Sequence, residues 1–495
     1  MGIVIRQSIK ATIVSYFGAC LGALLVIYIY PKSLTPEQIG LTRVLMESAL
    51  IFSSFAQIGM SSIALKFFPY FKDPVNNDNG FVFFIFFVPL FGFILFILLF
   101  QLFQNEVVLI FAQKSELFTK YLFFIIPLTL FTIYTTISET YASILQRIVV
   151  PKFIKEVLVR VLTLIIVLAF YYNKISLNQF VILFTITYGI ATTLNLIYIN
   201  SIKKINFKPN LKFLQGSIKK ELLWFMLYMI VVGIGSSVAS RIDVFMLSSQ
   251  VSLSGAGIFT IAFFIASFIE MPSRAIFQIV TPFTSDALKN NDIQFVDLIY
   301  KRTSLNQFIV AGLLFLLIWI NVENIFNIMP NGKIYETGKY VIFFIGLAKV
   351  FDALTGINGI ILGNSKYFYY TLYFIFFLAI LTIINNLYFI PIWGIVGSAF
   401  ATFISIIAYN LILVIFVKWK LGVQPFTKNT FIALFILGLT YSLSLIIPSF
   451  SNPIIDIIVR SLIISTVFIF LVFRLKVSED INNTLISLFN RLKVR

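Results

Sequence analysis

The sequence predicts an all-α, multi-pass membrane protein, and three observations support this fold class. Of its 495 residues, 59% are apolar and only 12% are charged, and the mean hydropathy is +0.98. A soluble chain could not cover its surface with so few charges. Long apolar stretches recur along the chain without the alternation that a β-barrel requires. Because lipid offers the backbone no hydrogen-bonding partner, we expect these stretches to be helices.

Fourteen stretches are long enough to cross about 30 Å of hydrocarbon, which takes roughly 20 helical residues. The expected spans are residues 11–30, 41–65, 81–103, 121–145, 154–172, 178–199, 223–247, 256–283, 306–325, 339–362, 368–389, 392–417, 429–448 and 454–474. The first span is interpreted as a retained helix rather than a signal peptide. Its apolar run is long and is followed by Tyr30, Pro31 and Lys32 instead of small residues.

Composition excludes several kinds of chemistry. Histidine is absent and Cys20 is the single cysteine, which excludes disulfides, Cys/His zinc sites and histidine-based acid–base catalysis. We therefore expect no metal and no cofactor. The 37 Lys and Arg against 20 Asp and Glu give a formal net charge of +17. In a membrane protein this excess indicates loops that face anionic lipids rather than nucleic acid.

The distribution of Lys and Arg predicts the orientation of the chain. The termini and the loops after even-numbered spans, counted with Lys155 and Arg474 at the adjoining span ends, hold 25 of these residues, whereas the loops after odd-numbered spans, counted with Lys339, hold 6. Cytoplasmic loops carry such an excess. We therefore expect an even number of spans, with both termini in the cytoplasm.

A long basic loop divides the chain into two similar halves. We expect an N-lobe of spans 1–6 at residues 1–200, a cytoplasmic linker at 201–222 and a C-lobe of spans 7–12 at 223–420. Spans 13 and 14 at 421–476 form an appendage, and 477–495 form a cytoplasmic tail. Apolar residues at helical spacing predict that the tail and part of the linker lie along the membrane surface; a solvated linker is the alternative. These residues are Leu211, Leu214, Ile218 and Leu222 in the linker, and Ile481, Leu485, Leu488 and Leu492 in the tail.

Matched residues suggest that the two halves are repeats displaced by about 217 positions. The matches are Gly18 with Gly235, Gly40 with Gly257, and Lys152 and Phe153 with Lys366 and Tyr367. Since each half has six spans, both halves enter the membrane from the same side. They are expected to be pseudo-symmetric parallel repeats about an axis along the membrane normal, with a cleft between them.

Charged residues inside the spans are the functional candidates, because each costs about 2.5–3.5 kcal/mol on insertion scales. Arg43 with Glu47 in span 2 and Glu270 with Arg274 in span 8 have i,i+4 spacing, and the second pair flanks Pro272 at a possible gate. The i,i+3 spacing predicts that Lys349 and Asp352 in span 10 neutralise each other. Arg241 and Asp243 are expected on different sides of span 7. We interpret Arg160 as a residue that reaches the membrane surface, and Asp456 with Arg460 as a structural pair.

Three segments resemble a known family. Residues 2–10 (GIVIRQSIK), 241–247 (RIDVFML) and 255–262 (GAGIFTIA) are similar to the polysaccharide flippases of the multidrug/oligosaccharidyl-lipid/polysaccharide exporter superfamily, which move O-antigen and capsule repeat units. The resemblance implies a V-shaped pair of six-helix lobes, with spans 1, 2, 7 and 8 lining the cavity. It also implies a transporter of an undecaprenyl-diphosphate-linked oligosaccharide in the bacterial inner membrane, rather than an enzyme. A glycan polymerase or glycosyltransferases of the pathway are further candidate partners.

A diphosphate cargo would explain the arginines, because guanidinium groups bind phosphate oxygens bidentately and stay charged. The predicted diphosphate-binding residues are Arg43, Arg241, Arg274 and Lys349. The predicted supporting or gating acids are Glu47, Asp243, Glu270 and Asp352. Of these, Glu47 and Glu270 are expected to hold the arginines while the cavity is empty. The candidates for sugar recognition are Ser236, Ser237, Ser240 and Gln278.

Three other functions remain open: a peptidoglycan lipid-precursor flippase, a multidrug exporter of the same superfamily, and a membrane glycan polymerase or ligase. An acidic cavity without spare arginines would favour the exporter. Polymerases and ligases resemble chains with a large outer loop, whereas the longest outer loop here, about residues 104–120, is short. The sequence contains no G-x-x-x-x-G-K-[ST] nucleotide loop, so transport would draw on an ion gradient, the membrane potential or consumption of the cargo.

Overall fold

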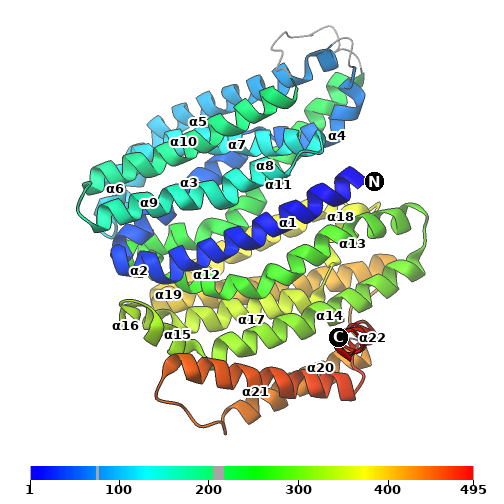
Figure 1. Cartoon of the computed structure of the whole chain (residues 1–495). Helices are drawn as coiled ribbons and strands as arrows, with labels where there is room; N and C mark the ends of the chain where they lie inside the picture. The colour runs from blue at the N-terminus through cyan, green and yellow to red at the C-terminus, as the bar shows by residue number, and fades with distance from the viewer. Residues whose placement is uncertain (1, 74–76, 204–216, 494–495) are drawn as a thin grey trace. The chain divides into compact units, whose positions relative to one another are not determined.

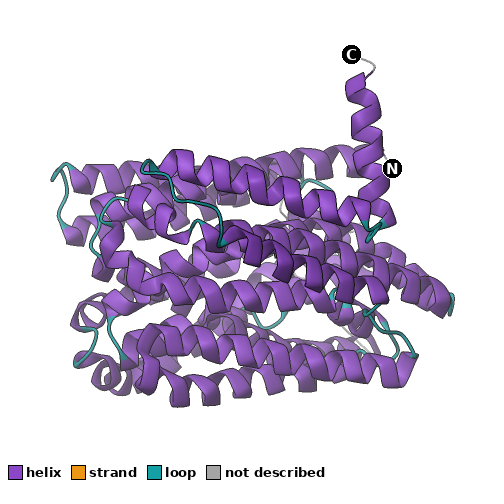
Figure 2. Cartoon of the chain, turned by 90° about the horizontal axis from the view of Figure 1, so that it is seen from below, coloured by secondary structure: helices purple, strands orange, loops and turns teal. Residues whose placement is uncertain are grey.

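The computed structural model describes residues 2–73, 77–203 and 217–493, and within these ranges the chain is helical with no strand (Figure 2). The predicted all-α class is therefore confirmed. The chain forms two compact units, residues 1–260 and 261–495, and the helices of each unit are labelled in Figure 1.

The first unit begins at the N-terminus and ends within α12. Its helices are α1 (Gly2–Ala23), the π-helical η1 (Leu24–Ile29), α2 (Tyr30–Ser33), α3 (Pro36–Ala56), α4 (Met60–Phe71), η2 (Asn77–Gly80), α5 (Phe81–Ala112), α6 (Glu116–Tyr121), η3 (Leu122–Phe124), α7 (Ile125–Ile144), α8 (Val149–Phe153), the π-helical η4 (Ile154–Leu158), α9 (Val159–Tyr171), α10 (Leu177–Ile202), α11 (Ser217–Gln250) and α12 (Leu253–Ser267).

The second unit takes up the remainder of the chain. Its helices are the 3-10 helix η5 (Phe268–Glu270), α13 (Met271–Lys289), α14 (Ile293–Ile320), α15 (Val322–Ile328), α16 (Gly332–Tyr335), η6 (Glu336–Gly338), α17 (Lys339–Thr355), α18 (Asn358–Asn364), α19 (Tyr370–Leu421), α20 (Lys428–Ser444), α21 (Pro453–Arg474) and α22 (Glu479–Lys493).

The length and apolarity of these helices show a multi-pass membrane protein. Among the described residues, ten helices could cross a membrane, or eleven if the bent pair Gly332–Thr355 and Asn358–Asn364 forms one span. The predicted count of fourteen stays a prediction. Two of the fourteen, 368–389 and 392–417, fall within the single helix α19 of 52 residues. A straight helix of that length would measure about 78 Å, and Gly394, with φ 56° and ψ −128°, breaks it.

Local sequence signals place the helix starts. Thr35 and Gln38 form a capping box at the start of α3, where each side chain bonds the backbone N–H of the other residue. Ser176 and Gln179 do the same for α10. These bonds satisfy the first N–H groups of the helix, which have no partner within it.

The helices α3 and α12 approach each other more closely than any side chain would allow. A Cβ atom added at Gly40 would lie 2.0 Å from the carbonyl oxygen of Leu253, and one added at Gly257 would lie 1.9 Å from that of Pro36. Small residues allow such backbone contact between membrane helices. The two glycines that the sequence matches as repeats therefore lie against each other.

The boundary between the compact units differs from the predicted lobe boundary. The predicted linker is 201–222, of which 204–216, including Leu211 and Leu214, lie outside the described residues. Ile218 and Leu222 belong to α11, which packs along α3 in the first unit. An ion pair between these two helices, described below, explains this packing. The division into two six-helix lobes stays a prediction.

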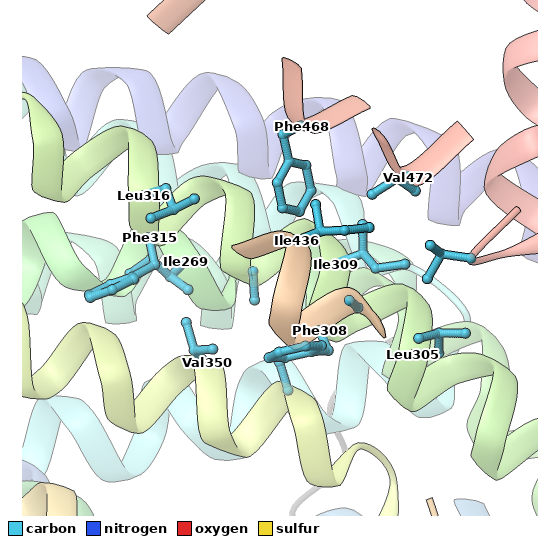
Figure 3. Packing of buried hydrophobic residues seen from close by; sticks show 14 residues of the cluster. Ile269, Leu305, Phe308, Ile309, Phe315, Leu316, Val350, Ile436, Phe468 and Val472 are labelled. Carbon is cyan, nitrogen blue, oxygen red and sulfur yellow. The ribbon is translucent and has the colours of Figure 1, made fainter. Parts of the chain in front are cut away.

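Spans 13 and 14 pack on α14 in the second unit (Figure 3). The side chains of Ile436 on α20 and Phe468 on α21 meet Phe308 and Ile309 of α14, and Val350 of α17 belongs to the same apolar cluster. Between membrane helices such side chains stabilise the contact by van der Waals packing, because lipid is as apolar as the side chains themselves. The last two spans are therefore an integral part of the second unit.

The predicted tail forms α22, which runs across the long helices of its unit instead of alongside them (Figure 2). Its first turn is tied to α14. Arg302 Nη2 lies 3.4 Å from Glu479 Oε2, and Asn306 Nδ2 donates to Asp480 Oδ2 at 2.9 Å. A location of this helix on the inner leaflet stays a prediction.

Candidate functional site

One carboxylate in the first unit binds two arginines. Arg43 Nη2 lies 2.6 Å from Glu47 Oε1, and Arg241 Nη1 lies 2.6 Å from Glu47 Oε2. The Glu47 side chain is only 4% exposed, whereas both arginines are about one-third exposed. Each carboxylate oxygen of Glu47 therefore pairs with one guanidinium. We call Arg43, Glu47 and Arg241 the Glu47 cluster, and these three side chains carry a net charge of +1.

The helix geometry explains how the Glu47 cluster forms. Arg43 and Glu47 are one turn apart on α3, and the packing of α11 on α3 brings in Arg241. The Nε atoms of Arg43 and Arg241 are buried and have no hydrogen-bond partner among the described residues. Buried donors normally have an acceptor. The cluster therefore holds spare cationic donors in addition to its spare charge.

A second carboxylate binds two cations in the second unit. Arg274 Nε donates to Glu270 Oε1 at 3.0 Å, and Lys349 Nζ pairs with Glu270 Oε2. The Glu270 side chain is 22% exposed and that of Arg274 is 64% exposed. This Glu270 cluster also has a net charge of +1, but it is more open to its surroundings than the Glu47 cluster.

The ion pair of Lys349 is with Glu270, and Lys349 also lies near enough to Asp352 for an electrostatic interaction, so their mutual neutralisation stays a prediction. Asp352 Oδ1 accepts a hydrogen bond from Asn410 Nδ2 at 3.0 Å. The pair of Lys349 with Glu270 involves the 3-10 turn η5, which ends at Glu270 and packs on α17. This turn interrupts span 8 just before Pro272, the first-turn proline of α13. The gate predicted around Pro272 stays a prediction.

Asp352 belongs to a polar network beside a break in span 10. Asn358 Nδ2 donates to Asn410 Oδ1 at 2.8 Å, and Gly356, with φ +65°, separates α17 from α18. In the first unit, Asp243 is buried on α11 two residues after Arg241. Asp352 lies near enough to Glu270 and Lys349 to interact with both electrostatically.

Arg160 lies in the middle of a helical run that is longer than the sequence suggested. Span 5 was predicted to begin at residue 154, which places Arg160 near its end, but α8 already begins at Val149 and α9 ends at Tyr171. Arg160 is thus about 16 Å from either end at 1.5 Å per residue. It pairs with Glu156 at 2.9 Å. The i,i+4 spacing of these two residues was the signal that could have revealed the pair.

The predicted sugar-binding residues are all exposed or half-buried. Ser236 and Ser240 are exposed on α11, and their hydroxyls donate to the carbonyls of Gly233 and Ser236 at 3.1 and 2.7 Å. Ser237 is half-buried, and Gln278 is exposed on α13. A hydroxyl that donates to its own helix can still accept a hydrogen bond from a ligand. Their role in sugar binding stays a prediction.

The pair interpreted as structural has several local partners. Asp456 accepts hydrogen bonds from Arg460 Nε at 2.9 Å and from the backbone N–H of Phe450 at 3.0 Å. Asn324 on α15 also donates to Asp456, at 2.5 Å. These bonds join α15, α21 and the loop before α21, which agrees with a structural role.

Comparison with known proteins identifies the fold. No family model and no curated protein matches the sequence, but solved structures do. The lipid II flippase MurJ in an inward closed conformation is 17% identical, with a TM-score of 0.70 over 93% of this chain and 98% of that chain. An inward-facing multidrug resistance MATE family transporter of the MOP superfamily is 14% identical, with a TM-score of 0.62 over 80% and 93%.

A MOP superfamily transporter from Pyrococcus furiosus is also similar, at 13% identity and a TM-score of 0.53 over 85% of this chain and 95% of that chain. At these identities the likeness concerns the fold. The chain therefore has the fold of the transporters of the MOP superfamily.

Proposed function

We propose that this protein flips an undecaprenyl-diphosphate-linked oligosaccharide repeat unit across the bacterial inner membrane by alternating access. It would act as a transporter and not as an enzyme. The shared fold with MOP-superfamily transporters, the sequence resemblance to polysaccharide flippases and the two cationic clusters support this proposal.

The observation that carries the proposal is the sharing of Glu47 by Arg43 and Arg241. A single carboxylate cannot neutralise two guanidinium groups, so the cluster attracts anions. A diphosphate has several negative oxygens, which can take the place of the carboxylate and also accept from the spare Nε donors. After release of the cargo, Glu47 again forms ion pairs with both arginines, so that no cation is left unpaired in the membrane.

The Glu270 cluster supplies the same chemistry within its own unit. Arg274 and Lys349 bind the diphosphate in the proposal, and Glu270 holds them when no cargo is bound. Asp243 and Asp352 act as supporting acids. A cationic drug would be repelled by either cluster, which argues against a multidrug exporter.

A peptidoglycan lipid-precursor flippase is the second candidate. The observation in its favour is the structural likeness to MurJ at a TM-score of 0.70. A lipid-linked diphosphate is common to both cargoes, so the two cationic clusters fit either one. The sugar portion of the cargo distinguishes them.

The basic loops suggest the setting of the transporter. We propose that both termini lie in the cytoplasm and that the Lys- and Arg-bearing loops contact anionic lipids of the inner leaflet. A glycan polymerase or glycosyltransferases of the same pathway are proposed partners on these loops.

Reconstitution tests the proposed function directly. Proteoliposomes with a fluorescent undecaprenyl-diphosphate oligosaccharide or with lipid II on one leaflet would report which cargo becomes accessible on the other. Arg43→Ala and Arg241→Ala should each reduce flipping at equal protein level, whereas Arg474→Gln, at an exposed position on α21, should not. Undiminished flipping by both arginine variants would refute the proposed role of the Glu47 cluster.

A further inference from the structure

The first unit contains another arginine, Arg160, in an unusual setting. Its side chain is 29% exposed and pairs with Glu156 one turn earlier. The Nη1 atom is buried and has no hydrogen-bond partner among the described residues. One end of this guanidinium therefore binds a carboxylate, and the other is a cationic donor without an acceptor.

Two glycines of α1 make room for the guanidinium. A Cβ atom added at Gly18 would lie 3.0 Å from Arg160 Nη1, and one added at Gly22 would lie 3.1 Å from Arg160 Cζ. The guanidinium thus lies directly against the α1 backbone, in what we call the glycine notch of Gly18 and Gly22. Glu156 also borders Gly18, but Nη1 has no hydrogen-bond acceptor there among the described residues, so this is a poor resting place for a charged donor.

Two tyrosines connect Arg160 with the Glu47 cluster. The hydroxyl groups of Tyr30 and Tyr188 each lie within electrostatic range of both Arg43 and Arg160. Arg43 and Arg160, together with Arg241 through its ion pair with Glu47, therefore belong to one charged region that includes Glu47 and Glu156. All three have a buried guanidinium nitrogen without a hydrogen-bond partner among the described residues.

Arg43 and Arg160 lie at different distances from the ends of their helices. Arg43 is 7 residues from the start of α3, and Arg160 is 11 residues from the end of α9. These separations correspond to about 10 Å and about 16 Å. Arg160 is thus farther from the end of its helix than Arg43 is.

We propose that Arg160 is a third anion-binding residue of the transport site, which rests in the glycine notch when the site is empty and leaves it to bind a diphosphate. This inference rests on the proposed function and adds a residue to it. An incoming diphosphate would give Nη1 the acceptor that it lacks, and Glu156 would hold the arginine between transport cycles.

The proposal makes opposite predictions for two variants. Arg160→Gln removes the charged donor and should weaken diphosphate binding about tenfold or more, as expected for the loss of a charged hydrogen bond. Arg160→Lys should give an intermediate loss, since an ammonium group lacks the planar fork. Gly22→Ala keeps the charge but crowds the notch, so it should favour the released arginine and tighten binding about two- to fivefold.

Binding to the purified full-length protein in detergent micelles tests this, with inorganic pyrophosphate and undecaprenyl diphosphate as separate probes. Loss of affinity for both probes in Arg160→Gln, with tighter binding by Gly22→Ala, would support the proposal. Loss for the lipid probe alone would support it for a lipid-borne diphosphate. Gly359→Ala, where an added Cβ meets nothing within 4 Å, and Arg474→Gln are the matched controls.

Failure of the inference and failure of the proposed function have different results. Wild-type affinity in Arg160→Gln, together with reduced affinity in Arg43→Gln, would overturn the inference and leave the proposed function intact. Absence of binding of either probe to the wild type would overturn both. If Arg160→Gln does not fold, the affinities of Arg160→Lys and Gly22→Ala for the two probes test the proposal instead. Wild-type affinity in both variants would overturn it, and so would weaker binding by Gly22→Ala.

Discussion

The two units of the molecule each contain a glutamate that pairs with two cations, but the two clusters differ in exposure and in the type of cation. Each places one glutamate between two cations, but the Glu47 side chain is 4% exposed and binds two guanidinium groups, whereas that of Glu270 is 22% exposed and binds one guanidinium and one ammonium. Arginine offers a fixed planar fork and lysine a mobile point charge. The Glu47 cluster is therefore expected to be the more ordered and the more selective for phosphate, and the Glu270 cluster the more adaptable.

Removal of the two glutamates should give the largest difference. Glu47→Ala leaves two cations without their carboxylate in a buried position and should lower the free energy of unfolding by about 3 kcal/mol. Glu270→Ala should cost about 1 kcal/mol, because Arg274 is mostly exposed and can be hydrated. Unfolding of the purified variants in micelles measures both values. Equal losses would remove the distinction between the clusters.

Arginine-to-lysine exchange should give the next largest difference. Arg241→Lys should weaken the apparent affinity for the lipid-linked cargo about tenfold, since the bidentate contact is lost. Arg274→Lys should weaken it about threefold or less, because an exposed charge contributes little. Flipping rates as a function of cargo density in proteoliposomes give these affinities. A larger effect at Arg274 would reverse the assigned roles.

The smallest effect is expected at Asp352. Asp352→Asn keeps an oxygen that can accept from Asn410 and leaves the pairing of Lys349 with Glu270 untouched, so stability should change by less than about 1 kcal/mol. Glu270→Gln should cost more, because it removes the charged partner of Lys349. If Asp352→Asn instead proves the more damaging variant in thermal unfolding, Lys349 depends on Asp352 after all.

The sequence was sufficient for the features that depend on local composition. Apolar length locates the helices, and i,i+4 spacing identifies the pairs of Arg43 with Glu47 and Arg274 with Glu270, since both partners lie on one helix. The second cation of each carboxylate could not be found in this way. Arg241 reaches Glu47 from a helix 194 residues further along the chain, and such a contact depends on how helices pack.

Two features could not be predicted, because they depend on where a helix starts and whether it is continuous. The ion pair of Lys349 with Glu270 involves the 3-10 turn η5, which packs on α17. Span 5 was predicted to begin at residue 154, whereas the helix already begins at Val149, ahead of Pro151. Proline is tolerated in the first turn of a helix, and α8 includes it.

The contact of α3 with α12 at Gly40 and Gly257 has a consequence for motion. Where two helices contact each other through glycine backbone, no side chain loses conformational entropy on contact or gains it on separation. Freezing of side-chain rotamers therefore does not oppose the meeting of these helices at this point. A methyl group at either position would prevent the backbone contact, because it would overlap a carbonyl oxygen of the other helix.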